Sequence, residues 1–516
     1  MSTTKRIISG SAASWVRIGI TMLAQLLLVP VYLKYWSIEV YGIWIAIQAL
    51  VSILSTLDQG HQTFLEFEFL RFGRDKPKEI ALTLWSSLSI ALFIGLIEIG
   101  IVLFFIFCGN LKGLLGLKVA SEAGLMRDAG YVLLMLMTVW AFVSNIGGIF
   151  VRVLSPFGYY ARMNWWGVFS TVVASIVPVI AVAFGAGLFE AGVVMAAASV
   201  LYSIPQYFDI YRLMKKEKIG YQGTSFKHGT SNFILSLALS GKGLLENARQ
   251  QGVRVILAPL AGASGLVAFS TMRTGANIAL QGLNTITNPL MPEIMRFLNQ
   301  KDQEKMESSF GVVWAVVIFF LTPSVMLLQV FIGPLFKIWT QSQVEFDPLL
   351  FALLSLGVLV FAVAQPAISI VRGNNLLKPQ VIIASIAAVL VVGGMFVLVP
   401  VKGILGAGIS LLAGEIVAAF CYRFVARQWL HKQGMAWPVR SSRIAIAAVC
   451  VAAFAMLAMY FVPGYNWLFL AAGLLVLVYL MKQYLHALPP IAVSKLQDMS
   501  RKVGILNRLI VYGKKR

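Results

Sequence analysis

The stretch Asn232–Leu257, NFILSLALSGKGLLENARQQGVRVIL, decides how the rest of the chain is threaded. It is long enough to cross the roughly 30 Å hydrocarbon core of a bilayer, yet it carries Lys242, Glu246, Arg249 and Arg254. A charge at the bilayer centre costs roughly 2.5–3.5 kcal/mol on insertion scales, whereas a large apolar side chain returns only about 0.3–0.6 kcal/mol. A helix of this composition cannot face lipid on all sides. Either it is not a membrane helix, or its polar side faces water or protein inside a bundle.

The distribution of positive charge decides between these two possibilities. Hydropathy predicts further spans at residues 11–33, 40–57, 80–107, 129–151, 163–184, 187–210, 264–288, 309–332, 347–371, 380–400, 403–425, 443–462 and 465–486. With the polar stretch as the seventh of fourteen helices, 31 of the 42 Lys and Arg residues lie at the termini and in even-numbered loops, and 6 lie in odd-numbered loops. This bias predicts that both termini are cytoplasmic. Without the polar helix, the basic 423–443 segment would lie outside.

The composition indicates an all-α polytopic membrane protein. The 516 residues are 59% hydrophobic and 12% charged, with a mean hydropathy of +0.82, and a lipid environment allows only helices or closed barrels to span it. The net charge of +21 favours attraction to anionic headgroups over binding to nucleic acid. Cys108, Cys421 and Cys450 form no metal or disulfide pattern. We expect no metal and no cofactor.

The most polar linker in the middle of the chain, residues 212–231, suggests a division into two halves. We predict an N-terminal lobe of helices 1–6 at residues 1–211 and a C-terminal lobe of helices 7–12 at residues 232–426. Helices 13 and 14 would occupy residues 427–486, followed by a basic cytoplasmic tail at residues 487–516. The two six-helix lobes are expected to enclose a central cavity.

Excess positive charge inside the predicted helices points to an anionic substrate. The cations are Arg17, Lys242, Arg249, Arg254 and Arg273. Guanidinium groups bind phosphates bidentately, so we predict that these residues bind a diphosphate near the membrane midplane. Two structural alternatives stay open: Arg17 could snorkel to the cytoplasmic surface, and Lys242 could pair with Glu246 at i, i+4.

A polar stripe in the eighth helix extends this site. Arg273, Asn277, Gln281 and Asn284 are spaced by 4, 4 and 3 residues and therefore share one helix face. Together with Gln25 of the first helix, these amides are predicted to line the cavity. Hydrogen bonding between neighbouring helices is the structural alternative.

Isolated carboxylates are the candidates for ion coupling. Glu98 and Glu415 each lie within an apolar span, and Glu246 lies in the polar helix. A buried carboxylate could take up H+ or Na+; alternatively, Glu98 could be the structural partner of Arg17 or Arg152. Asp58 and Gly60 predict a turn that ends the second helix. No nucleophile–base pair, phosphate-binding loop or HExxH motif is present, so we predict a transporter rather than an enzyme.

Several short motifs resemble the O-antigen/polysaccharide lipid flippases of the multidrug/oligosaccharidyl-lipid/polysaccharide exporter superfamily. They are the first helix from Arg17 to Pro30, Tyr41-Gly42-Ile43-Trp44, Leu57-Asp58-Gln59-Gly60, the Pro289–Pro292 turn, Phe331–Trp339 and Arg372-Gly373-Asn374. The family's usual Leu-Asp-Leu-Gly-Leu turn is Leu-Asp-Gln-Gly-His in this chain.

The resemblance implies a function and a location. It implies fourteen helices around a V-shaped cavity that flips undecaprenyl-diphosphate-linked sugar repeat units, such as those of lipopolysaccharide O-antigen, from the cytoplasmic to the periplasmic leaflet. The protein would be a monomer in the bacterial inner membrane, with a polysaccharide polymerase and a chain-length regulator as partners.

Four other functions compete with this one. A multidrug antiporter of the same superfamily would favour acidic sites, and a lipid II flippase would fit equally well. A polysaccharide polymerase or ligase usually needs a large periplasmic loop, whereas the longest odd-numbered loop here has only about 20 residues. A scaffold of the assembly complex would not need costly internal charges.

Overall fold

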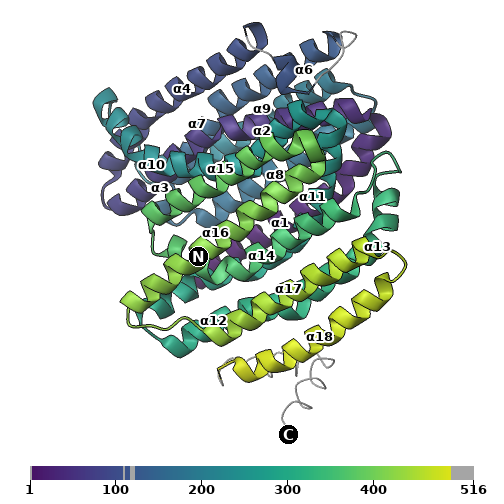
Figure 1. Ribbon diagram of the computed structural model, residues 1–516. Helices are drawn as coiled ribbons and strands as arrows, with labels where there is room; N and C mark the ends of the chain where they lie inside the picture. The colour runs from purple at the N-terminus through teal and green to yellow at the C-terminus, as the bar shows by residue number, and fades with distance from the viewer. Residues whose placement is uncertain (1–2, 109–110, 117–122, 490–516) are drawn as a thin grey trace. The chain divides into compact units, whose positions relative to one another are not determined.

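The computed structural model describes residues 3–108, 111–116 and 123–489, and this part of the chain contains helices and no strand (Figure 1). Its helices are α1 Thr3–Tyr35, α2 Ile38–Leu54, α3 Thr56–Phe72, α4 Pro77–Phe107, α5 Leu111–Leu114, α6 Ala123–Val139, α7 Asn145–Val153, α8 Tyr160–Ala183, α9 Leu188–Lys216, α10 Phe226–Gln250, α11 Gly252–Asn299, α12 Gln303–Val316, α13 Thr322–Trp339, α14 Pro348–Gly373, α15 Leu377–Lys402, α16 Ile404–Lys432, α17 Val439–Phe461 and α18 Asn466–Ala487. Two π-helical turns join consecutive helices: Trp140–Ser144 joins α6 to α7, and Val317–Leu321 joins α12 to α13.

The predicted all-α polytopic architecture is confirmed. Twelve helical segments of the described chain are long and apolar enough to cross a membrane, or thirteen if α2 and α3, which are bent by 41° relative to each other, form one span. One of these segments, Phe226–Leu283, has 58 residues, about twice the length that one crossing needs. If this segment is counted as two spans, and α2 with α3 as one span, the total is fourteen, the number predicted from the sequence.

The chain forms two compact units. Unit 1 contains residues 1–271, 339–344 and 392–407, and unit 2 contains residues 272–338, 345–391 and 408–516. The predicted lobe boundaries at residues 211 and 232 stay a prediction. Most of the predicted basic tail, residues 490–516, lies outside the described residues.

Unit 1 has an apolar core where α3, α4, α7 and α9 meet. Leu65 and Phe69 of α3 pack with Leu84 of α4, Ile149 of α7 and Ile210 of α9, and all five are almost fully buried. These buried side chains place one face of α3 in the core of unit 1, while Phe67 and Leu70 of the same helix are exposed.

Unit 2 is built around aromatic side chains from α12 and from the segment just before α17. Phe310 and Trp314 of α12 lie with their ring centroids 6.0 Å apart, and each is 5.8 Å from the ring of Trp437. The indole of Trp314 donates a hydrogen bond to the Val363 carbonyl of α14 at 2.9 Å. α17 and α18 pack side by side in the same unit (Figure 1).

Three predicted helix boundaries are wrong. The turn predicted at Asp58 and Gly60 is absent, because α3 is helical through both residues and the bend lies earlier, at Ser55. The polar stretch 232–257 is two helices, because α10 ends at Gln250 and α11 begins at Gly252. The Pro289–Pro292 turn is also absent, since the backbone stays helical to Asn299. The separation predicted between spans 7 and 8 is confirmed by a kink at Gly262, whose φ of 75° suits glycine.

Candidate substrate-binding site

The polar helix α10 packs closely against α3 because small residues face each other. A Cβ atom at Gly60 would lie 2.4 Å from the Cα atom of Ser240, so only glycine allows this approach. The Ser240 hydroxyl donates to the Leu57 carbonyl at 3.2 Å. One turn earlier on α10, the Ser236 hydroxyl lies 3.2 Å from Nδ1 of His61. Small-residue contacts with hydrogen bonds between helices are the usual way in which membrane helices associate.

Just beyond this contact the two helices diverge around a polar cavity of about 390 Å³. Its lining comes from the bend between α2 and α3 and from one face of α10: Ser52, Thr56, Gln59, Gly60, Thr63, Leu239, Lys242, Gly243, Glu246, Asn247 and Gln250. The α10 residues follow the helical spacing of three and four, so the polar face of α10 faces this cavity. Lys242 and Glu246 thus line the cavity, and their separation from lipid stays a prediction.

Asn247 fixes one end of the cavity. Its amide nitrogen donates to the Ser52 carbonyl at 2.7 Å and to the Thr56 hydroxyl at 2.6 Å. The carbonyls in the last turn of a helix need such outside donors, and Ser52 lies in the last turn of α2. The bend at Ser55 thus creates the acceptors that hold α10 in place.

The predicted cations are distributed over three helices. Lys242 lines the cavity and Arg249 lies half-buried on the same helix. Arg254 is half-buried near the start of α11, where its guanidinium group donates to the Gln251 side chain at 3.0 Å. Arg17 is exposed on α1, 3.7 Å from the position that a Cβ atom of Gly167 would occupy in α8. Arg273 is half-buried on the part of α11 that belongs to unit 2.

The predicted polar lining is also divided between the units. Gln25 is half-buried on α1 in unit 1, whereas Asn277 and Gln281 are half-buried on α11 in unit 2. The helix is continuous over this stretch, so these two residues and Arg273 share a face as predicted. The side chain of Asn284 lies outside the described part of the structure.

Glu98 lies next to Asp58 in the interior of unit 1. Their exposed fractions are 0% and 1%, and each carboxyl group is the electrostatic neighbour of the other. Asp58 Oδ2 accepts a hydrogen bond from the Trp140 indole at 3.0 Å. Among the described residues, neither Glu98 oxygen nor Asp58 Oδ1 makes a hydrogen bond that meets normal geometry. The sequence had given Asp58 only a capping role, and that interpretation is wrong.

Arg152, one of the two structural partners considered for Glu98, is engaged elsewhere. Its Nε atom lies 3.5 Å from a carboxylate oxygen of Glu66, and its guanidinium group also donates to Gln62 at 2.6 Å. Gln62 in turn donates to the Asn145 side chain at 2.9 Å. These residues form a buried polar network between α3 and α7 that the sequence analysis missed. The sequence feature that could have predicted this network is the polar run from Asp58 to Gln62, because polar side chains in a membrane helix normally face other protein segments.

Glu415, the other isolated carboxylate, lies in unit 2. It is half-buried on α16, and its Cγ atom is 3.9 Å from the position of a Cβ atom at Gly357 of α14. The glutamate side chain therefore packs beside α14 at an ordinary van der Waals distance.

The C-terminal end of α1 is held by the last residue of α13 and the segment that follows it. Pro30 lacks an N–H group, so the Leu26 carbonyl has no helical donor, and the Trp339 indole donates to that carbonyl at 2.6 Å. Gln341 donates to the Pro30 carbonyl at 3.3 Å, and Gln343 donates to the Leu33 carbonyl at 2.6 Å. All of these residues belong to unit 1.

Comparison with known proteins gave matches in structure but not in sequence. No protein-family model matches the chain, and no curated protein sequence matches it. Among solved structures, the lipid II flippase MurJ in an inward closed conformation is similar with a TM-score of 0.63 and 14% identity, over 93% of this chain and 99% of that one. An inward-facing multidrug resistance MATE family transporter of the MOP superfamily is similar with a TM-score of 0.61 and 15% identity, over 81% of this chain and 98% of that one.

A third similar structure is a MOP superfamily transporter from Pyrococcus furiosus, with a TM-score of 0.51 and 15% identity, over 83% of this chain and 96% of that one. Because these neighbours span nearly the whole described chain, the likeness is to the complete fold and not to one helix pair. The chain therefore has the same fold as these solved flippase and transporter structures.

Proposed function

We propose that this protein is a flippase that moves undecaprenyl-diphosphate-linked oligosaccharide repeat units, of O-antigen or a related surface polysaccharide, from the cytoplasmic to the periplasmic leaflet by alternating access. The observation that carries this proposal is the polar cavity of α10, where Lys242 and Glu246 lie among amide and hydroxyl groups on a helix long enough to span the membrane. The fold supports it, since the similar structures are a flippase and transporters.

The chemistry of the site favours a substrate that carries phosphate. Lys242, Arg249 and Arg254 place three cations on neighbouring turns of α10 and α11, and Arg273 follows further along α11. Ammonium and guanidinium groups bind diphosphate oxygens with charge-assisted hydrogen bonds, which strengthen where water is scarce. Hydroxyl and amide groups such as those of Ser52, Thr56 and Gln59 suit the hydroxyl groups of a sugar.

Transport would be coupled to an ion gradient through the Asp58–Glu98 pair. Two adjacent carboxylates removed from water repel each other, so the pair favours uptake of a proton or another cation. A change in occupancy at this pair would act on α3, the helix that also lines the α10 cavity. Glu415 and Glu246 are the alternative coupling groups.

A lipid II flippase is the second candidate, and the likeness to MurJ over 99% of that chain favours it. Both substrates are diphosphate lipids, so the same cations would serve. A multidrug antiporter is less consistent with the site, because cationic drugs would be repelled by Lys242 and Arg249. A membrane polymerase or ligase would need a catalytic constellation that the sequence does not contain.

The test is transport by purified protein in liposomes. The assay would follow undecaprenyl diphosphate that carries a fluorescent oligosaccharide, with a membrane-impermeant reductant reporting its movement between leaflets. Replacing Arg249 and Arg273 by Ala should lower the transport rate at least tenfold, as charge-assisted hydrogen bonds contribute roughly 1.5–3 kcal/mol each. The control double variant removes the exposed Arg427 and Arg440.

Two outcomes would contradict the proposal. Unchanged transport by the Arg249→Ala/Arg273→Ala variant would remove the cationic site from the mechanism. Transport of lipid II in the same assay, with no movement of the oligosaccharide lipid, would assign the protein to the second candidate function.

A further inference from the structure

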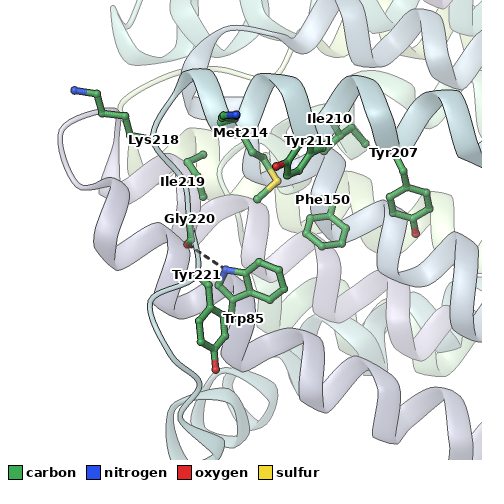
Figure 2. Close-up of a pocket in the computed structure, with 11 residues that line it drawn as sticks. Trp85, Phe150, Tyr207, Ile210, Tyr211, Met214, Lys218, Ile219, Gly220 and Tyr221 are labelled. Atoms are coloured by element: carbon green, nitrogen blue, oxygen red, sulfur yellow. Dashed lines mark hydrogen bonds between the residues drawn. The ribbon is translucent and has the colours of Figure 1, made fainter.

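A second cavity of about 540 Å³ lies in unit 1, away from the α10 site (Figure 2). It is lined by residues of α4, α7, α9 and the segment after α9: Trp85, Phe150, Tyr207, Ile210, Tyr211, Met214, Lys215, Lys218, Ile219, Gly220 and Tyr221. Its volume lies in the range of small-molecule sites. None of these residues belongs to the predicted diphosphate site.

The wall of the pocket is a chain of aromatic rings. The ring of Trp85 lies 6.0 Å from that of Phe150 and 5.5 Å from that of Tyr221, and Phe150 lies 6.0 Å from Tyr207. The polar atoms of two of these side chains already have partners. Trp85 donates to the Gly220 carbonyl at 3.2 Å and Tyr207 donates to the Val143 carbonyl at 2.7 Å. These side chains therefore offer the pocket mainly their apolar faces (Figure 2).

The rim of the pocket is basic. Lys215 and Lys218 are exposed at the end of α9, and in Figure 2 the Lys218 ammonium group extends away from the aromatic side chains. The acidic residue between them, Glu217, accepts a hydrogen bond from the Tyr159 hydroxyl at 2.6 Å. The positive charge of the rim is thus available to a ligand.

The backbone holds these residues in place. α9 ends in a tight turn in which the Ile219 N–H donates to the Met214 carbonyl at 2.9 Å, and Lys218 adopts a left-handed φ of 58°. This turn brings Gly220 and Tyr221 back over Trp85. The result is an apolar slot with the Lys215 and Lys218 side chains at its rim. Tyr211 and Tyr221 beside it are exposed, and exposed tyrosines of this kind are typical of a membrane interface.

We propose that this pocket binds an anionic glycerophospholipid, with an acyl chain between Trp85, Phe150 and Met214 and the headgroup phosphate at Lys215 and Lys218. Basic pockets between membrane helices are known to bind acidic headgroups, and lysine side chains reach from an apolar stem to a polar surface. The positive charge of the rim complements a phosphate group. Free inorganic phosphate has no apolar part that could fill the aromatic slot, so a phosphate attached to an acyl chain fits the pocket better. This site goes beyond the proposed transport function, since it involves none of its cations.

The test measures retention of phosphatidylglycerol by the purified full chain in detergent, by native mass spectrometry. Phosphatidylcholine with the same acyl chains is the comparison lipid. The variant combines Lys215→Gln with Lys218→Asn, because Asn tolerates a left-handed backbone. The control combines Lys78→Gln with Lys216→Gln, which removes the same charge from exposed lysines outside the pocket.

We expect the pocket variant to retain phosphatidylglycerol at least about tenfold more weakly than the wild type, at roughly fivefold per lysine, and the control to stay within twofold. Equal weakening by the control would show general surface attraction and overturn the proposal, as would unchanged retention by the pocket variant. Equal binding of dihexanoyl phosphatidylglycerol would contradict the role of the apolar wall. Retention of undecaprenyl diphosphate without phosphatidylglycerol would assign the pocket to the carrier lipid.

Discussion

At the scale of single residues, the placement of Asp58 and Glu98 has the largest consequences for function. Both side chains are buried to 1% exposure or less; Glu98 comes from a predicted span, whereas Asp58 comes from α3, which lies between two predicted spans. The π-helical turn at Trp140 points an indole N–H at Asp58. Such turns are frequent at functional sites of helical proteins, and Glu98 makes no hydrogen bond of normal geometry among the described residues.

We predict that Glu98→Gln uncouples transport from an imposed ion gradient. The amide keeps the shape of the side chain but cannot take up a proton, so the transport rate in liposomes should no longer respond to a pH difference or a Na+ gradient, while slow movement without a gradient persists. The response of the wild type should be at least several-fold. Glu415→Gln is the matched control in unit 2, and loss of coupling in that variant alone would move the coupling site to Glu415.

At the scale of helices, two contacts within unit 1 matter most, because each compensates for a residue that destabilises its own helix. Gly60 lowers the intrinsic stability of α3 but allows α10 to approach it. Pro30 removes a helical hydrogen bond from α1, and Trp339 replaces it with a bond from a distant segment.

We predict that Gly60→Ala destabilises the protein. The added methyl group would lie 2.3 Å from the Ser240 hydroxyl oxygen, and overpacking of this kind typically costs about 1–3 kcal/mol. The melting temperature in detergent should fall. Gly100→Ala on α4, where no heavy atom lies within 4 Å, should leave it unchanged or raise it, because alanine favours helix by up to about 1 kcal/mol. Equal melting temperatures for the two variants would rule out the close contact.

We also predict that Trp339→Phe and Pro30→Ala are coupled. Trp339→Phe removes the donor to the Leu26 carbonyl and should cost about 0.6–1.7 kcal/mol, from the average to the maximum found for hydrogen bonds between membrane helices in double-mutant cycles. In the Pro30→Ala background, residue 30 regains an N–H group for that carbonyl, so Trp339→Phe should cost less. A double-mutant cycle on unfolding free energy measures the difference, and additive effects would disprove the coupling.

At the scale of the whole molecule, the topology in the membrane follows from charge. The positive-inside bias predicts that the termini and the linker at residues 212–231 are cytoplasmic and that the turn between α17 and α18 is periplasmic. Every assignment after α10 depends on the polar helix crossing the membrane, and its length and its place in the bundle support that crossing.

Cysteine labelling tests this topology. In a chain whose Cys108, Cys421 and Cys450 are replaced by Ala, Tyr465→Cys should react with an impermeant maleimide in intact spheroplasts. Gln222→Cys should react only after the membrane is opened. Both positions are exposed in the structure, so a failure to react reports the side of the membrane. If neither position reacts until the membrane is opened, both lie on the cytoplasmic side and the polar helix does not span; a reversed pattern would instead invert the orientation of the whole protein.

The sequence by itself determined the helical class and the presence of many helices long and apolar enough to cross a membrane. These follow from transfer free energies, which depend on residue type and can be summed along the chain. Only the tertiary structure decided that Asp58 faces Glu98 and not a helix cap, that Gly60 admits α10, and that Trp339 bonds the Leu26 carbonyl. Each of these pairs lies 40 or more residues apart in the chain, and their contact depends on how helices pack, which no local pattern of hydropathy or charge encodes.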